Sequence, residues 1–564
     1  GLRWVAAESF TARPAQAGWK SDPYSLKALG DLAFCTGVNR FMFSSYAAEP
    51  YVDKFPGFTL GPYGLNFGRT VTWWEQSRPW VDYISRCQWL LSQGRFVADV
   101  CYFYGEGAPN TLTSRGHLSP GIPEGYDYDG CDAETLQKME VHDGRLTLPG
   151  GMSYRVLVLA DSDRMTPGIL KKVRDLVQAG AMVVGAPPSG LSPSLQDYPK
   201  ADSEVKKLVE ELWGAGDGKV VDKEHVSTQP LEKLFPQIGL PEDFSSTTMY
   251  PKLAEIHRKT DNADIYFVSN QANHAVAPEC TFRVTGRVPE LWHADTGVIE
   301  TAPIYRQADG RTTIPLQLDP SGSVFVIFRK ATGMEDAIVS MQRTDSKHNS
   351  GIQPDTAQFD LTRLGGEPAM LTPWVPGIYT ATFASGKKWR CDVSGVAPAR
   401  ELPGPWMLRF PPKWGAPGQV TLEKLISWTD DPDDGVKHFS GTATYTGQFQ
   451  VNDGELSPGK VLRLNLGEVK NLAELTVNGK NLGVLWKPPF MVDLTGIARV
   501  GTNTLEVKVT NLWPNRMIGD QKLPPEQRYT WSTNEPYQAD SPLLKSGLIG
   551  PVTLQSTTTL RMAP

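Results

Sequence analysis

Apolar positions form runs whose spacing changes along the chain. In the first 75 residues, apolar segments at residues 4–7 and 38–51 each run into a polar loop. The stretch between them, residues 22–37, carries helix signals, with Asp22 as a cap at its start and Gly37 at its end. This part of the sequence therefore predicts a strand, a helix and a second strand.

A second pattern, typical of alternating helices and strands, follows. The helix predicted over residues 78–94 has one apolar face at period 3.6, formed by Trp80, Ile84, Cys87 and Leu91. The continuous apolar runs that follow are typical of buried parallel strands; they cover residues 96–106, 153–162 and 181–187. The helix at residues 166–180 between them has Thr166 as its N-cap and Gly180 after its end. Residues 86–235 are therefore predicted to form a doubly wound, flavodoxin-like α/β domain.

From about residue 240 the period changes to short alternating strands. Residues 236–335 are predicted to form a β-sandwich, and residues 336–402 a small β domain or linker region. Residues 403–564 are predicted to form a second β-sandwich. There, Asn478 and Gly479 separate two alternating runs, which is the strongest short signal for a hairpin with a type I′ turn.

Composition narrows the class of protein. The 564 residues are 40% hydrophobic, with a net charge of −6 and 56 basic residues. This balance argues against a nucleic-acid-binding face, which needs clustered positive charge. No apolar run is long enough to predict a membrane span. None of the six cysteines forms a C-x-x-C pair, so a zinc cluster is not expected, and their density is too low for a disulfide scaffold.

Two glutamates stand where strands end, at positions that suit catalysis. Glu8 follows the first apolar run and Glu49 the second. In a parallel barrel, the carboxyl ends of the strands line the active site, and a carboxylate there can act as acid, base or nucleophile. The alternatives are that Glu8 caps a loop or pairs with Arg40, and that Glu49 is a surface acid before Pro50.

The segment FGRTVTWWEQSRPW, residues 67–80, is a candidate sugar-binding loop. Trp73 and Trp74 are consecutive, and an exposed ring suits stacking on the apolar face of a sugar. Arg69 and Glu75 would supply polar contacts beside the rings. The alternative is that the two tryptophans pack between this part of the chain and the next domain.

Other chemical motifs are weak. The segment GYDYDGCD offers Asp127, Asp129 and Asp132, but it lacks the glycine and the distal glutamate of a calcium loop, so a structural turn is expected. All eight histidines lie at or after His117. A Ser-His-Asp site is therefore not expected in the first, barrel-like part of the chain.

Several blocks occur in an order that resembles a known family. They are AAESFT, GVNRFMFSSYAAEPY, PGFTLGPYGLNFGRTVTWWE, YISRCQWLLSQGRFVADVCYFYGE and HFSGTATYTGQF. Together they resemble the C-terminal half of the large α-L-rhamnosidases of glycoside hydrolase family 106. The last domain also resembles the galactose-binding-like jelly roll of β-galactosidases and β-mannosidases.

The resemblance implies a (β/α)₈ catalytic barrel followed by accessory domains, with residues 1–85 as the C-terminal part of the barrel. It implies an inverting hydrolase of plant-type polysaccharides or glycosides, with Glu8 as general base and the general acid on a strand upstream of Gly1. Arg40, Glu49, Arg69, Trp73, Trp74 and Glu75 are then the expected substrate-binding residues. On this interpretation the chain is a fragment, inactive alone.

The resemblance further implies a calcium ion in the active site, with ligands that we cannot assign, and a periplasmic or secreted location. The oligomeric state stays open. The chain also departs from the family pattern, because Ser44-Ser45 and Ala48-Glu49 stand where that pattern has histidine and His-Gln. This departure puts the sugar specificity in doubt more than the fold.

Two alternatives stay open. One is a β-galactosidase or β-glucuronidase-like hydrolase, for which the mechanism would be retaining. The other is a non-catalytic carbohydrate-binding protein, in which Trp486 and Trp513 of the terminal sandwich form an aromatic platform. Packing of both rings in the sandwich core would argue against that platform.

Overall fold

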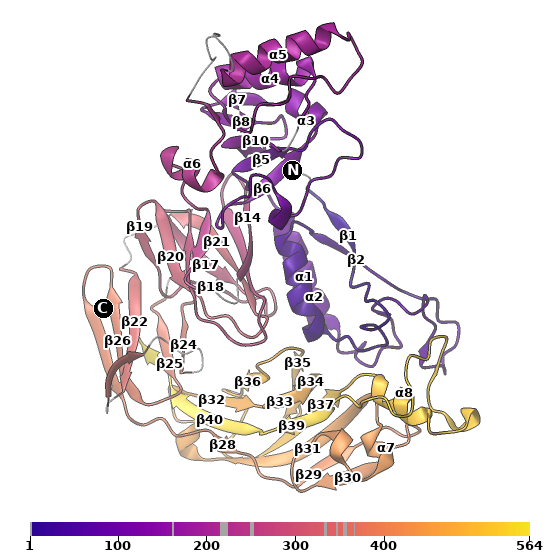
Figure 1. Ribbon diagram of the computed structural model, residues 1–564. Helices are drawn as coiled ribbons and strands as arrows, with labels where there is room; N and C mark the ends of the chain where they lie inside the picture. The colour runs from indigo at the N-terminus through magenta and orange to yellow at the C-terminus, as the bar shows by residue number, and fades with distance from the viewer. Residues whose placement is uncertain are drawn as a thin grey trace.

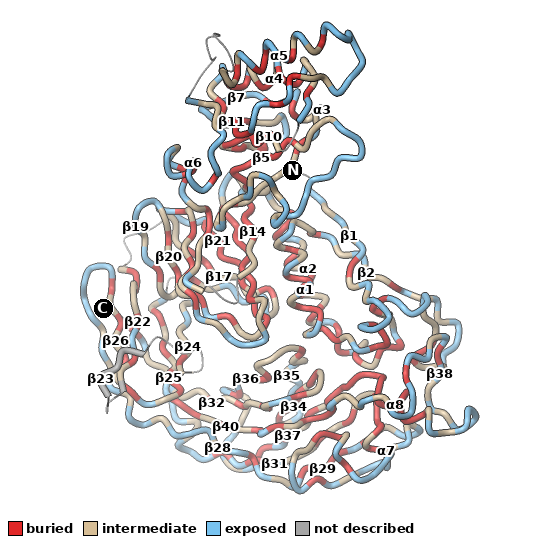
Figure 2. Tube along the Cα trace, in the orientation of Figure 1, coloured by how far each residue is buried: buried red, intermediate tan, exposed pale blue. Residues whose placement is uncertain are grey.

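The computed structural model divides the chain into α/β and all-β parts (Figure 1). It describes residues 3–160, 163–214, 224–248, 253–331, 336–345, 348–352, 358–365 and 367–563. Residues 161 and 162, the end of one predicted strand, lie outside the described residues. Sheets and the helices that cover them hold most of the buried positions (Figure 2). The expectation of a multidomain, sheet-rich chain with α/β and all-β parts is confirmed.

The first layer is a pair of parallel strands backed by two helices. Its elements are β1 (Ala6–Ser9), α1 (Pro23–Cys35), β2 (Arg40–Phe43) and α2 (Arg78–Leu91). As predicted, Asp22 caps α1, and it does so in a capping box with Ser25. Phe41 stacks on Phe34 of α1 at 4.4 Å, and Phe43 stacks on Trp80 of α2 at 5.4 Å. These contacts bury one face of the strand pair.

The predicted domain boundary after residue 85 is wrong, because α2 runs through it. The helix continues to Leu91 on one apolar face, and its last turns contribute Cys87, Leu90 and Leu91 to the same core as α1. The short strand β4 (Arg95–Phe96) then joins the edge of a later sheet by pairing with β14 (Leu253–Lys259). The first layer therefore extends to about residue 96.

The predicted doubly wound α/β domain is present. Its five parallel strands are β5 (Val100–Phe103), β6 (Tyr128–Cys131), β10 (Val156–Leu159), β11 (Met182–Val184) and β12 (Val226–Ser227). Their order in the sheet is β12-β11-β10-β5-β6, which is the flavodoxin-like order. Thr166 caps the helix that follows β10, as predicted. A three-stranded antiparallel sheet beside this unit contains β7 (Glu140–His142), β8 (Arg145–Thr147) and β9 (Ser153–Tyr154).

Helices cover both faces of this sheet, as a doubly wound unit requires. They are α3 (Ala133–Gln137), α4 (Pro167–Gln178), α5 (Lys200–Trp213) and α6 (Leu231–Gln237). The first three share a core with Cys101, Phe103 and Leu157. The last packs against alternate residues of the same strands, such as Tyr102 and Val156.

A β-sandwich follows, as predicted. Its larger sheet has the order β18-β17-β21-β15-β14-β4, and its smaller sheet has the order β13-β16-β20-β19. The strands not yet given are β13 (Phe244–Ser246), β15 (Asp264–Asn270), β16 (Glu279–Phe282), β17 (Arg287–Trp292), β18 (Ile299–Thr301), β19 (Arg306–Ala308), β20 (Arg311–Pro315) and β21 (Ser323–Ala331). One face of the larger sheet meets the smaller sheet, and its other face packs on α1 and α2 through residues such as Phe267 and Phe325.

The next β region contains two small sheets. One contains β22 (Ile338–Asp345), β23 (His348–Ile352), β26 (Gly377–Phe383) and β27 (Lys388–Val393); the other contains β24 (Phe359–Thr362), β25 (Met370–Pro373) and β41 (Leu560–Arg561). Because β41 comes from the end of the chain, this region is tied to the last domain.

The last domain is a two-sheet sandwich. One sheet contains β28 (Arg400–Glu401), β32 (Lys460–Asn465), β36 (Met491–Asp493) and β40 (Thr553–Thr558). The other contains β29 (Trp406–Arg409), β30 (Gln419–Leu422), β31 (Thr442–Val451), β34 (Leu472–Val477), β35 (Lys480–Leu485) and β37 (Gly501–Thr510). The predicted type I′ hairpin joins β34 to β35, with Asn478 and Gly479 both at positive φ. Further short elements are α7 (Asp434–Lys437), α8 (Pro514–Asp520), β33 (Glu468–Lys470) and β39 (Gly547–Gly550).

A buried ionic network joins the first layer to the first sandwich. Lys27 of α1 contacts Asp31 at 2.6 Å, and both side chains are almost fully buried. The ammonium also donates to the hydroxyl of Ser323 at 2.8 Å, and Ser269 donates to Asp31 at 3.0 Å. Tyr83 of α2 donates to the other oxygen of Asp31. Every member has a partner, so the network specifies how the helices sit on the sheet.

We expect Lys27→Met to destabilise the protein by about 3 kcal/mol, because Asp31 would remain buried without its cation. Urea unfolding followed by circular dichroism measures this change. Arg78→Ala is the control, since Arg78 pairs with Asp82 at the same spacing but at the surface, where such pairs contribute about 1 kcal/mol or less. Equal losses in the two variants would contradict the assignment.

A second network crosses from the α/β domain to the sandwich. His257 of β14 lies between Asp243, 2.9 Å from Nδ1, and Asp264, 3.3 Å from Nε2. Arg283 bridges Asp243 to Asp99 of the α/β domain. Burial by itself would lower the pKa of His257, but the two carboxylates outweigh it and raise the pKa to about 9.

Stability should therefore fall as the pH rises from 6.5 to about 9. The imidazolium contributes its full stabilisation below the ordinary pKa of 6.5 and loses it through the folded-state value near 9. Asp243 and Asp264 have lowered pKa values and stay ionised throughout this window. Thermal unfolding across the window should show a steeper fall in the wild type and in His142→Gln, an exposed control, than in His257→Gln, where the raised pKa values of Asp127 and Glu255 still contribute a fall. Equal slopes in the wild type and in His257→Gln would contradict this interpretation.

Candidate functional site

The face of the strand pair that carries Glu8 is uncovered in the described part of the chain. Side chains alternate along β1 and β2, and in this register Ala6, Glu8, Arg40 and Met42 share one face. These four residues are exposed, whereas the opposite face lies under α1 and α2. Glu8 thus stands near the carboxyl end of a parallel strand and faces open space.

Hydroxyl groups hold the Glu8 carboxylate. Thr11 donates to Oε1 at 2.6 Å, and Ser44, which follows β2, is a second donor. These hydrogen bonds favour the charged form and lower the pKa of Glu8 below its ordinary value. Glu8 is therefore an ionised carboxylate at neutral pH, able to accept a proton or a hydrogen bond.

Arg40 does not form the ion pair with Glu8 that the sequence left open. It stands opposite Ala6, and its guanidinium lies over the ring of Trp4 at 5.1 Å. A cation held against an aromatic ring still has donors for a ligand. The strand pair therefore presents an acid, a cation and an aromatic ring side by side on one face.

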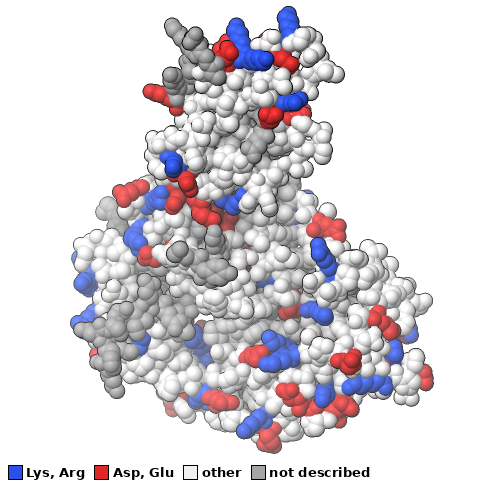
Figure 3. Space-filling model, viewed as in Figure 1, with Lys and Arg blue, Asp and Glu red and all other residues white. Residues whose placement is uncertain are grey.

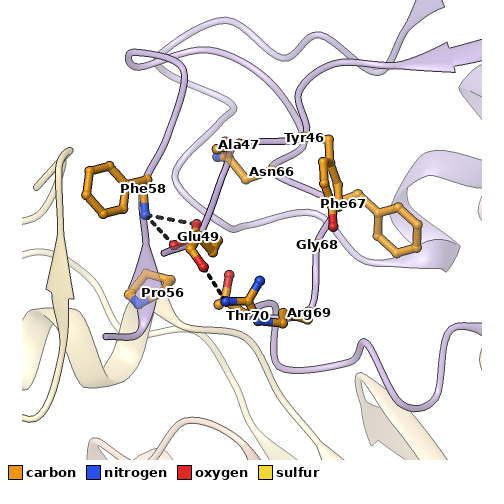
Figure 4. A pocket seen from close by; sticks show the side chains of 10 residues that line it. All are labelled: Tyr46, Ala47, Glu49, Pro56, Phe58, Asn66, Phe67, Gly68, Arg69 and Thr70. Carbon is orange, nitrogen blue, oxygen red and sulfur yellow. Dashed lines mark hydrogen bonds between the residues drawn. The ribbon is translucent and has the colours of Figure 1, made fainter. Parts of the chain in front are cut away.

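Glu49 lies in the loop after β2 and lines a small pocket (Figure 4). Its two oxygens accept from the backbone N–H of Phe58 at 2.9 and 3.1 Å. Arg69 donates to the backbone oxygen of Glu49 and closes one side of the pocket. The sequence thus placed Glu49 and Arg69 at one site, and the structure shows that Glu49 also shapes the loop.

Gly57 shows how closely that loop is built around Glu49. The residue has φ +89°, and a Cβ there would lie 2.3 Å from Glu49 Oε2. Only glycine therefore lets the backbone pass this close to the carboxylate.

The two consecutive tryptophans differ in environment. Trp73 is only 2% exposed, donates to the backbone oxygen of Ser21 and stacks on Phe67 at 5.2 Å. It is a core residue, and its predicted role in stacking on a sugar does not fit this burial. Trp74 is half-buried, with its ring 5.0 Å from Phe67, and Glu75 is exposed.

Trp486 and Trp513, the alternative platform in the last domain, are also buried. Each is 4% exposed, and Trp513 donates to the backbone oxygen of Thr70 at 2.8 Å. They join the last domain to the first layer, so neither offers a face to a ligand.

Three aromatic residues at this end of the molecule were missed by the sequence analysis. The ring of Phe58 lies 5.9 Å from that of Tyr51 and 5.1 Å from that of Trp531, which belongs to the last domain. Tyr51 is 51% exposed and Trp531 37%. A contact across more than 470 residues leaves no local signal in a sequence, which explains the omission.

The resemblance implied a calcium ion, and its ligands stay unassigned in the described part of the chain. Among the described residues, no group of three or more histidine, cysteine, aspartate and glutamate side chains is arranged to hold a metal ion. The groups that contact Glu8 are hydroxyls, and Glu49 is engaged with a backbone N–H.

The visible surface of the described residues carries no large patch of one charge. On the face seen in Figure 3, acidic and basic side chains are interspersed with broad uncharged areas. Within the described residues, no helix is both long and apolar enough to cross a membrane. A carboxylate near a strand end, with arginines and exposed aromatic rings in the loops that follow, offers both charged and apolar groups for binding a sugar.

One protein-family model matches the first part of the chain. The model of glycoside hydrolase family 106, described as alpha-L-rhamnosidase, matches residues 1–307, which is more than half of the chain. The chain belongs to this family.

Two relatives extend the likeness to the whole chain. A rhamnosidase from Novosphingobium sp. PP1Y has a similar structure, with a TM-score of 0.80 and 36% identity, over 98% of this chain and 48% of that one. A protein of Formosa agariphila, described as "Putative beta-glucuronidase", is 30% identical over 98% of this chain and 63% of its own length. The chain thus spans about half to two thirds of the length of these relatives.

We expect Glu49→Ala to loosen the loop that contains Phe58. Loss of a charged acceptor should speed amide exchange at Phe58 by about tenfold to a hundredfold, since such a bond contributes roughly 1.5–3 kcal/mol. Hydrogen–deuterium exchange with peptide-level mass spectrometry measures this rate. Glu75→Ala, at an exposed glutamate of the same surface, is the control. Unchanged exchange in Glu49→Ala would show that the carboxylate does not hold the loop.

Proposed function

We propose that the protein hydrolyses α-L-rhamnosides of plant-type polysaccharides or glycosides, with Glu8 as the general base. The position of Glu8 carries this proposal: it stands near the carboxyl end of a parallel strand, on the uncovered face of the pair, and is ionised. Membership of family 106 and the likeness to a rhamnosidase structure support the choice of sugar.

The chemistry assigned to Glu8 follows from its charge. In an inverting hydrolase, an ionised carboxylate removes a proton from water as the oxygen attacks the anomeric carbon, while a protonated acid donates to the departing oxygen. The hydrogen bonds from Thr11 and Ser44 keep Glu8 in the form that this step needs. Inversion requires an acid about 6.5–9.5 Å away. We assign none among the described residues, since Glu49 binds the backbone of its own loop.

We also propose a barrel origin for the strand pair and a jelly-roll fold for the last domain. β1 and β2, parallel and covered by helices on one face only, fit two strands of a (β/α)₈ barrel whose interior face carries Glu8. The two-sheet last domain fits a galactose-binding-like jelly roll. We also propose a periplasmic or secreted location, which membership of family 106 supports.

A second candidate, a β-glucuronidase, is favoured by one observation, the description of the Formosa relative. Such an enzyme has to bind a sugar carboxylate, for which Arg40 and Arg69 are available near the site. A purely carbohydrate-binding role is less well supported, because Trp486 and Trp513 are buried.

In the full-length protein, we expect Glu8→Gln to lower kcat for 4-nitrophenyl α-L-rhamnoside by about 10²–10⁴-fold, because the base is lost, while L-rhamnose still binds. Release of 4-nitrophenol and titration calorimetry give the two values. Azide added to Glu8→Ala should restore turnover and yield the β-configured glycosyl azide, since azide needs no base.

Glu140→Gln, an exposed carboxylate of the α/β domain, is the control and should retain wild-type rates. A near-normal kcat in Glu8→Gln would show that Glu8 is not the base. If the wild type cleaves 4-nitrophenyl β-D-glucuronide and no α-L-rhamnoside, the second candidate replaces the first.

A further inference from the structure

The loop after β2 and the last domain meet in a short parallel sheet. β3 (Pro56–Gly57) pairs with β38 (Trp531–Ser532), and the hydroxyl of Thr533 accepts from the backbone N–H of Thr59 at 2.9 Å. The rings of Tyr51, Phe58 and Trp531 cluster at this junction, with Phe58 and Trp531 at 61° to each other. Two parts of the chain thus build one aromatic surface.

The last domain holds Trp531 in place through a buried ion pair. Asp520 of α8 contacts Arg516 at 3.0 Å, with both side chains at most 5% exposed. The second oxygen of Asp520 accepts from the backbone N–H groups of Tyr529 and Thr530 and from the Thr530 hydroxyl. Because the backbone beside Trp531 is held in this way, its ring loses little conformational freedom when a ligand binds.

The aromatic surface continues into the proposed active site. Ser44 bonds to Glu8, and Tyr46, two residues further on, lines the pocket of Glu49. Phe58 lines the same pocket and contacts Trp531. Ser44 and Tyr46 thus link Glu8 to the Glu49 pocket along the chain, and Phe58 links that pocket to Trp531.

This surface combines the two kinds of group that bind sugars. Aromatic rings pack against the apolar C–H face of a pyranose, and charged side chains beside them bond to its hydroxyls. Glu49 uses its carboxylate for one N–H only, and the described bonds of Arg69 use one guanidinium nitrogen. Both side chains have further capacity for hydrogen bonds.

We propose that Trp531, with Tyr51 and Phe58, binds the sugar on the leaving-group side of the scissile bond. This rests on the proposed function: a rhamnosidase removes a terminal rhamnosyl unit, so a subsite adjoining the reacting position receives the leaving group. The last domain then takes part in substrate selection, favouring rhamnosides whose leaving group is itself a pyranose.

Steady-state kinetics with rutinose, a rhamnosyl-glucose disaccharide, tests the subsite. In Trp531→Ala we expect KM for rutinose to rise about tenfold, the effect of losing one stacked ring, with kcat within about twofold of wild type. The inhibition constant of free L-rhamnose should stay unchanged, because rhamnose does not reach this surface. Trp531→Phe should recover most of the loss. Tyr51→Ala, on the other side of the junction, should also raise KM with little change in kcat, but by a smaller factor.

Trp89→Ala is the matched control, since Trp89 is 60% exposed on α2 and outside the proposed site. If Trp531→Ala and Tyr51→Ala have the same KM as this control, and the wild type releases rhamnose, the proposed subsite is wrong. The proposed function then still stands. A rise in the inhibition constant of L-rhamnose equal to the rise in KM would also overturn the subsite. A full-length wild type that cleaves no rhamnoside rejects the proposed function together with the subsite.

Discussion

The structure depends on one constraint: helices α1 and α2 must pack against two sheets at once. Their outer face covers β1 and β2, and their inner face lies on the large sheet of the first sandwich. Lys27 and Asp31 sit on that inner face, fully buried, and reach Ser269 and Ser323 of the sheet. Because buried charges tolerate no loss of partners, this network leaves the helices one position on the sheet. That position sets the direction of the strand pair and of Glu8.

The last domain completes the site from the opposite end of the chain. Trp513 bonds to the backbone of Thr70, and β38 pairs with β3, so the loops after β2 are held between two domains. Loops as long as these are usually the least ordered part of an enzyme. Here the accessory sandwich supplies their missing partners, which explains why a domain far away in the sequence contacts the candidate site.

Local signals allowed much of the fold to be predicted. The caps at Asp22 and Thr166, the parallel-strand runs of the α/β domain and the turn at Asn478 and Gly479 all depend on neighbouring residues, and the structure contains each of them. The prediction of a domain boundary after residue 85 was wrong because a boundary depends on contacts between distant segments. An amphipathic helix reveals that one face is buried, but not which neighbour buries it.

The sequence by itself determined the elements, the family and the position of Glu8 at the end of a strand, since these follow from periodicity, capping and motif order. Only the tertiary structure decided which aromatic rings are available to a ligand. Trp73, Trp486 and Trp513 are buried at domain contacts, whereas Tyr51 and Trp531 are exposed around Phe58, which lines the Glu49 pocket. Burial depends on packing between segments hundreds of residues apart, and a single sequence carries no local trace of that packing.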